Sequence, residues 1–122
     1  MIVADTSIWI DHLRSSNPAL TALVAEERLV AHPFVIAELA LGHIPRRQPF
    51  FDFLAALPSI EKVDDDHQLG FVEDNELFGT ELGFVDSHLL ASAAQHPNAR
   101  VWSRDKRLQA QAERLGLAYS PG

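Results

Sequence analysis

Short apolar runs alternate along the chain with longer segments of helical periodicity. The runs of strand length are 1–4, 29–31, 59–63 and 100–102, and a fifth candidate strand is 117–119. Between them, apolar positions recur at the spacing of one helix face. The expected helices are 6–13, 18–24, 34–41, 50–57, 64–77, 85–95 and 106–115. Strands that alternate with helices predict an α/β fold, a three-layer α/β/α sandwich on a mainly parallel central sheet.

Cap residues support these helices. Asn17-Pro18 has the order of an N-cap followed by proline at the first helical position. Other start signals are Thr6 or Ser7 and the acidic run Asp64–Asp66, and the expected stop signals are Gly42 and Gly116.

The composition predicts a single cytoplasmic domain over residues 1–122. Hydrophobic residues make up 47% of the 122 positions, which is enough for one compact core and too little for two. The chain has no cysteine, and we expect no membrane span, which needs about 20 consecutive apolar residues. A formal charge of -7 argues against coating nucleic acid through a general positive field, although local clusters of Lys and Arg remain.

Two of the apolar runs are followed by an aspartate. Asp5 ends VAD and Asp105 ends WSRD, each just before an expected helix. Ligands of parallel α/β sheets bind outside the carboxyl ends of the strands. A helix cap or turn residue is the ordinary explanation of one such aspartate. Two in the same sheet favour a shared site.

Two further acids lie in apolar helical segments. Glu38 is the only polar side chain in FVIAELALG, and we expect it to be buried and to coordinate a metal. A glutamate at the surface edge, or one paired with arginine, is the alternative. Asp86, in GFVDSHLLASA, shares a helix face with Leu89, Leu90 and Ala93, and a role as N-cap competes with an inward position. Four inward carboxylates predict bound Mg²⁺ or Mn²⁺, which take oxygen ligands.

These four segments, in this order, together resemble a PIN domain. They are VADTS, IAELALG, GFVDSHLLASA and WSRDKRL, and the likeness covers essentially the whole chain. At this length the chain resembles the VapC ribonuclease toxins of VapBC toxin–antitoxin pairs. Lys106 and Arg107 follow the last acid, where one common version of the motif has further acids.

The resemblance implies a metal-dependent endoribonuclease. The catalytic and metal-binding quartet would be Asp5, Glu38, Asp86 and Asp105, with Mg²⁺ or Mn²⁺ as the cofactor. The supporting hydroxyl residues would be Ser7, Ser103 and Thr6. It also implies a VapB-type antitoxin as partner, an RNA substrate and a homodimer, with no direct DNA binding by this chain.

The candidates for holding the RNA backbone are Arg104, Lys106, Arg46 and Arg47, and a solvated charged face is the alternative for each. Trp9 and Trp102 are expected to pack in the core rather than stack on bases.

Other enzyme classes fit this sequence less well than a PIN domain does. A haloacid dehalogenase needs a second aspartate at the position of Ser7, and a receiver domain needs paired acids and a lysine that are missing here. A catalytically silent PIN-like module that binds RNA or protein is the remaining alternative.

Overall fold

Three short parallel strands form the centre of the molecule. The computed structural model describes residues 1–121. The strand β1 (Ile2–Ala4) lies between β2 (Leu29–Val30) and β3 (Arg100–Trp102). All of β1 is buried, as a central strand covered on both faces must be.

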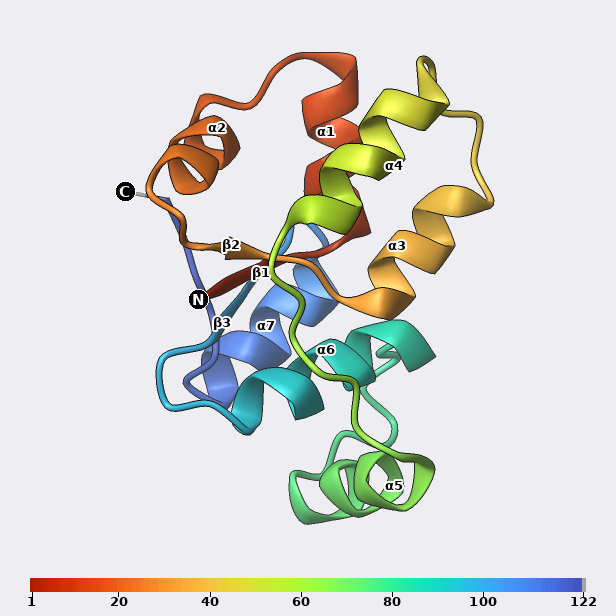
Figure 1. Cartoon of the computed structure of the whole chain (residues 1–122). Coiled ribbons are helices and arrows are strands. Elements are labelled where there is room, and N and C mark those ends of the chain that lie inside the picture. Colours follow the sequence, from red (N-terminus) through yellow and green to blue (C-terminus); the bar gives the residue numbers. More distant parts are fainter. Residues whose placement is uncertain (122) are drawn as a thin grey trace.

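Helices cover both faces of the sheet (Figure 1). One face carries α1 (Thr6–Arg14), α2 (Pro18–Ala25), α3 (Pro33–Ala40) and α4 (Arg47–Ala56). The other carries α6 (Phe84–Ala94) and α7 (Lys106–Arg114), with α5 (Asp65–Asp74) packed beyond α6. The predicted three-layer α/β/α sandwich is confirmed.

The core is built from the faces that the helices turn toward the sheet. The helix α6 is buried on all sides from Ser87 to Ala93, because it lies between the sheet and α5. Trp9 and Trp102 are 1% and 5% exposed, which confirms that both indoles pack in the core. Burying one large apolar side chain contributes about 1.5–3 kcal/mol, so both tryptophans are structural residues.

Two of the predicted strands are wrong. Within 59–63, only Ser59 forms a bridge, to Ala31. Within 117–119, only Ala118 forms a bridge, to Val101. Both segments run beside an edge strand too briefly to form a ladder. The helix predicted to reach Leu77 ends at Asp74, because Asn75 caps it.

The caps also differ from the sequence prediction. Asp5, not Thr6 or Ser7, is the N-cap of α1, because its side chain accepts a hydrogen bond from the Ile8 backbone N–H. Leu41, not Gly42, is the C-cap of α3. Asn17 and Asp64 do cap α2 and α5, and Gly116 follows α7 with a φ of 71°, as a terminating glycine should. No helix within residues 1–121 is long and apolar enough to cross a membrane.

Candidate active site

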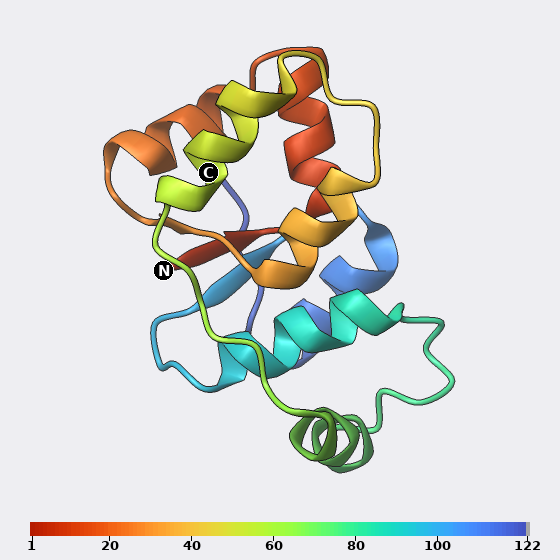
Figure 2. The same cartoon turned by 45° about the vertical axis from the view of Figure 1, so that its right-hand side comes forward.

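The carboxyl ends of β1 and β3 lie side by side at one edge of the sheet. The Asp5 backbone N–H donates to the Trp102 carbonyl at 3.0 Å, which continues the ladder one residue beyond β1. Figure 2 shows this edge on the right, where α1, α6 and α7 begin and α3 ends. Parallel pairing therefore brings Asp5 and the turn that holds Asp105 to the same edge.

Asp5 is a buried carboxylate held by hydroxyl groups. It is 4% exposed. Its Oδ1 accepts hydrogen bonds from the Ser7 hydroxyl at 2.5 Å and the Ile8 N–H at 3.2 Å, and its Oδ2 accepts one from the Ser103 hydroxyl. Burial raises the pKa of Asp5, and the bonds from Ser103 and Ser7 partly offset that rise.

The two serines also fix the turn between β3 and α7. Ser7 Oγ accepts a hydrogen bond from the Arg104 backbone N–H at 2.9 Å, and Ser103 Oγ accepts one from the Asp105 N–H at 2.8 Å. Each hydroxyl thus donates to Asp5 and accepts from the turn. This arrangement locks the carboxylate and the turn together.

Asp105 is exposed and caps α7. Its Oδ1 accepts from the backbone N–H groups of Arg107 at 2.8 Å and Leu108 at 3.2 Å. Asp5 likewise caps α1. The ordinary explanation of both aspartates, as helix caps, is therefore correct, and it is compatible with a shared position at the sheet edge.

Asp86 lies in the first turn of α6 and is half-buried. Gly83 is the N-cap of this helix, so the alternative role of Asp86 as N-cap is wrong. Burial raises the pKa of Asp86 to about 6, with further contributions from the negative charges of Asp5, Asp105 and Glu38. Asp5, Asp105 and Glu38 are therefore close enough to Asp86 to disfavour its charged form.

Glu38 is exposed, and the expectation of a buried glutamate is wrong. The helix α3 buries only Val35 and Leu39, and Leu41 just beyond its end is 89% exposed. An apolar run therefore did not mean burial on all sides. The Thr6 hydroxyl donates to Glu38 Oε1 at 2.7 Å, which directs this carboxylate toward the start of α1 and so toward Asp5.

The donor set fits a hard divalent cation by its chemistry. Carboxylate oxygens are the ligands that Mg²⁺ and Mn²⁺ prefer, and a cation would relieve the repulsion that raises the Asp86 pKa. Within residues 1–121, however, no three acidic or histidine side chains are gathered into a ready-made metal site.

The predicted RNA-binding residues fall into two groups. The Arg104 guanidinium lies at the sheet edge and pairs with Asp11, and Lys106 is exposed one residue after Asp105. Arg47, by contrast, donates to the carbonyls of Ala40 at 2.6 Å and Gly42 at 3.2 Å, and so holds the end of α3.

Arg46 stands beside Arg47 in a left-handed conformation with a φ of 52°. Sequence reasoning gave Asp11 no role, because nothing in its spacing showed that it would face Arg104 across the sheet edge.

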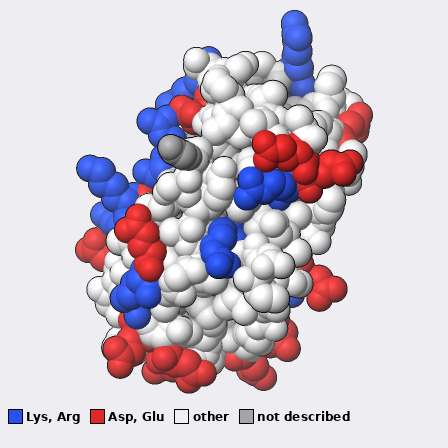
Figure 3. Space-filling view, turned by 90° about the vertical axis from the view of Figure 1, so that its left-hand side faces the viewer, with Lys and Arg blue, Asp and Glu red and all other residues white. Residues whose placement is uncertain are grey.

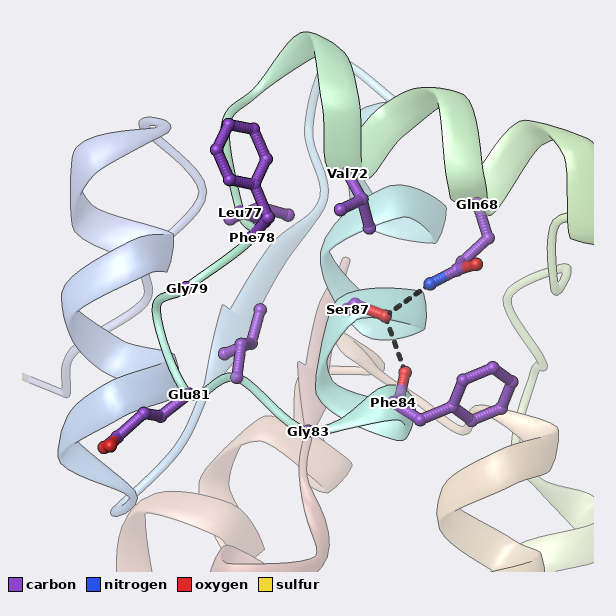
Figure 4. Close-up of a pocket in the computed structure, with 10 residues that line it drawn as sticks. Gln68, Val72, Leu77, Phe78, Gly79, Glu81, Gly83, Phe84 and Ser87 are labelled. Atoms are coloured by element: carbon purple, nitrogen blue, oxygen red, sulfur yellow. Dashed lines mark hydrogen bonds between the residues drawn. The ribbon is translucent and has the colours of Figure 1, made fainter.

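A separate hollow of about 430 Å³ lies between α5, the connector 77–83 and the start of α6 (Figure 4). Gln68 Nε2 donates to the Ser87 hydroxyl at 3.0 Å, and this hydroxyl donates to the Phe84 carbonyl at 2.7 Å. None of the four acids lines it. Figure 4 shows the Phe84 ring pointing away from this hollow.

The acidic residues that give the chain its negative charge are not confined to the candidate active site. On the face shown in Figure 3, Asp and Glu side chains gather at the end of the molecule formed by α5, and Lys and Arg lie among acids elsewhere. The exposed acids of α5 and its N-cap are Asp64, Asp65, Asp66, Glu73 and Asp74. Much of the -7 charge is therefore a solvated surface.

Comparison with known proteins identifies the fold and the family. The family model described as PIN domain matches residues 2–114. A solved structure, that of PAE2754 from Pyrobaculum aerophilum, superposes with a TM-score of 0.60 at 15% identity, over 93% of this chain and 85% of that one. The chain belongs to the PIN-domain family.

Relatives in sequence assign the chain to one type within the PIN-domain family. Ribonuclease VapC32 of Mycobacterium tuberculosis, from strains CDC 1551 / Oshkosh and ATCC 25618 / H37Rv, is 44% identical over 120 residues, which are 98% of this chain and 97% of the relative. Within the PIN-domain family, the chain is therefore of the VapC type.

Proposed function

We propose that this chain is a Mg²⁺- or Mn²⁺-dependent endoribonuclease and the toxin of a type II toxin–antitoxin pair. The observation that carries the proposal is the repulsion of the Asp86 carboxylate by Asp5, Asp105 and Glu38 where the parallel strands end, in a chain of VapC type. The name of its relative, Ribonuclease VapC32, supports RNA as the substrate.

Asp5, Glu38, Asp86 and Asp105 would hold the cation. When bound, such an ion lowers the pKa of a water molecule and offsets charge on the scissile phosphate. Three hydrogen bonds fix the two carboxylate oxygens of Asp5. Ser7, Ser103 and Thr6 are positioning residues, since each donates to one of these carboxylates.

Arg104 and Lys106 would bind the RNA backbone beside the acids. Both are exposed near Asp105, where the negative charge of the four acids would otherwise repel a phosphate. The alternative to RNA binding by Arg104 is a structural role, because its guanidinium pairs with Asp11. The contacts of Arg47 favour a structural role, and Arg46 remains a prediction.

The partner would be a VapB-type antitoxin in the cytoplasm, and the chain would form a homodimer that makes no direct DNA contact. The acidic site and the charge of -7 suit a partner segment that carries Arg or Lys. Light scattering of the purified chain tests the dimer.

Cleavage of a mixed cellular RNA pool tests the proposed activity. The purified chain should produce discrete fragments with Mg²⁺ or Mn²⁺ and none with EDTA, and Asp5→Asn should abolish them. Asp74→Asn is the matched control, because Asp74 is an exposed acid at the far end of α5. Fragments that persist in EDTA or in Asp5→Asn would overturn the metal-site assignment. Intact RNA under every condition would favour a silent binding module.

A further inference from the structure

One large aromatic side chain beside the acids is exposed without a structural reason. Phe84 is 62% exposed, although burial of a phenylalanine is normally favourable. It is the first residue of α6 and stands two positions before Asp86. The tryptophans, in contrast, are buried in the core.

Phe84 forms an aromatic pair with Phe34 of α3. The two ring centroids lie 6.0 Å apart, and the ring planes are inclined by 27°. Phe34 precedes Glu38 by four residues, so both lie on the same face of α3, one turn apart. The pair therefore joins the two helices that supply Glu38 and Asp86.

The buried ring of His88 packs against the rings of both Phe34 and Phe84. His88 is 1% exposed, and its ring contacts Phe34 and Phe84 edge-on, with both centroid distances 4.7 Å. Neither ring nitrogen of His88 has a hydrogen-bond partner within residues 1–121. The imidazole therefore serves as a packing surface that fixes the orientation of the pair.

A cation lies beside the Phe34 ring. The Lys62 ammonium lies 5.7 Å from the centroid of the Phe34 ring and is exposed. A flat aromatic face next to a positive charge is the combination that binds single-stranded nucleic acid, because the ring stacks on a base and the cation attracts the backbone. The lysine beside the ring favours a polyanionic strand over an apolar protein segment.

We propose that Phe84, backed by Phe34 and His88, stacks on an RNA base next to the scissile phosphate, and that Lys62 binds the backbone of the same nucleotide. This proposal rests on the proposed ribonuclease function. The platform would hold single-stranded RNA with little base preference, since every base has a π-face. It would also exclude duplex RNA, whose bases are already stacked.

Binding of a short single-stranded RNA that carries 2-aminopurine tests the proposal in the Asp5→Asn background, where we expect the RNA to stay intact. Stacking on Phe84 should quench the fluorescence at one position, and Phe84→Leu should remove that quenching and weaken binding about ten- to hundredfold. Phe84→Trp should preserve both. Phe78→Leu is the matched control, because Phe78 is 60% exposed on the connector.

The cleavage reaction separates the two proposals. If the wild-type chain cleaves RNA and Phe84→Leu raises KM while Phe84→Trp does not, the platform is supported. If Phe84→Leu binds and cleaves like wild type, the platform proposal is overturned and the nuclease stands. If Phe84→Leu weakens only the binding of a partner protein, the surface belongs to that partner and the proposal is overturned as well. If wild type cleaves no RNA, the proposed function itself fails.

Discussion

The hydroxyl of Ser103 donates a hydrogen bond to the buried carboxylate of Asp5, across two neighbouring strands and 98 positions of sequence. The same oxygen accepts the N–H of Asp105. One small side chain thus connects the first and the last acid of the proposed site. Substitution of Ser103 measures what this side chain contributes to stability and to activity.

Ser103→Ala should weaken both stability and activity. The substitution leaves one oxygen of a buried carboxylate without its donor, which costs about 1–3 kcal/mol. Cleavage should fall about ten- to hundredfold, as is usual when a supporting partner of a metal ligand is removed. Urea unfolding and initial cleavage rates measure the two effects. Ser103→Thr, which keeps the hydroxyl, should restore most of both, and equal loss in the two variants would contradict this role.

Asp86→Asn should make the metal-free protein more stable while abolishing its activity. Its carboxylate is partly desolvated and repelled by three others, so neutralising it removes an unfavourable charge. The expected gain near pH 7.5 is about 1–2 kcal/mol after allowance for solvent screening. Thermal unfolding in EDTA measures it. A loss of stability would show that burial and the three neighbouring acids do not disfavour the Asp86 carboxylate as described.

The same carboxyl group predicts a pH dependence. Because the pKa of Asp86 is raised to about 6 from an ordinary 3.8, the folded protein binds this proton more tightly than the unfolded chain does. Its stabilising contribution is therefore complete below pH 3.8 and is lost as the pH rises through about 6. Unfolding of wild type and Asp86→Asn across this range in EDTA tests the sign, and a constant difference between them would refute it.

Arg47→Ala should lower stability by about 1 kcal/mol and leave RNA binding nearly unchanged. Its guanidinium holds two carbonyl groups at the end of α3, which is a capping role. Arg46→Ala is the neighbouring control, and its stability effect should be smaller because Arg46 makes no side-chain cap bond. Filter binding with RNA separates the roles. Weaker RNA binding with unchanged stability would contradict the capping role and show that Arg47 binds the substrate.

Sequence reasoning anticipated the layers of the fold because they follow from local patterns. Strand β1, strand β3 and helix α6 lie within one residue of their predicted bounds, since apolar runs and helical spacing persist over their lengths. The strand predictions for 59–63 and 117–119 were wrong, because strand pairing depends on a neighbouring strand and not on local composition.

The candidate site was only partly visible in the sequence. The positions of Asp5 and Asp105 followed from the end of each strand, because parallel strands share an edge. The exposure of Glu38 did not, since a short helix at the rim leaves one face in water whatever its composition. The Phe34–Phe84 pair was missed because it depends on how α3 and α6 meet.

The central claim is that Asp5, Glu38, Asp86 and Asp105 together hold a divalent cation. Titration calorimetry with Mn²⁺ tests it most directly, on wild type, on each of the four Asn or Gln variants, and on Asp74→Asn as a control. The account predicts saturable binding by wild type and Asp74→Asn, and binding at least about tenfold weaker in each variant of the four. Equal Mn²⁺ affinity in wild type and Asp86→Asn, or no binding by wild type, would contradict it.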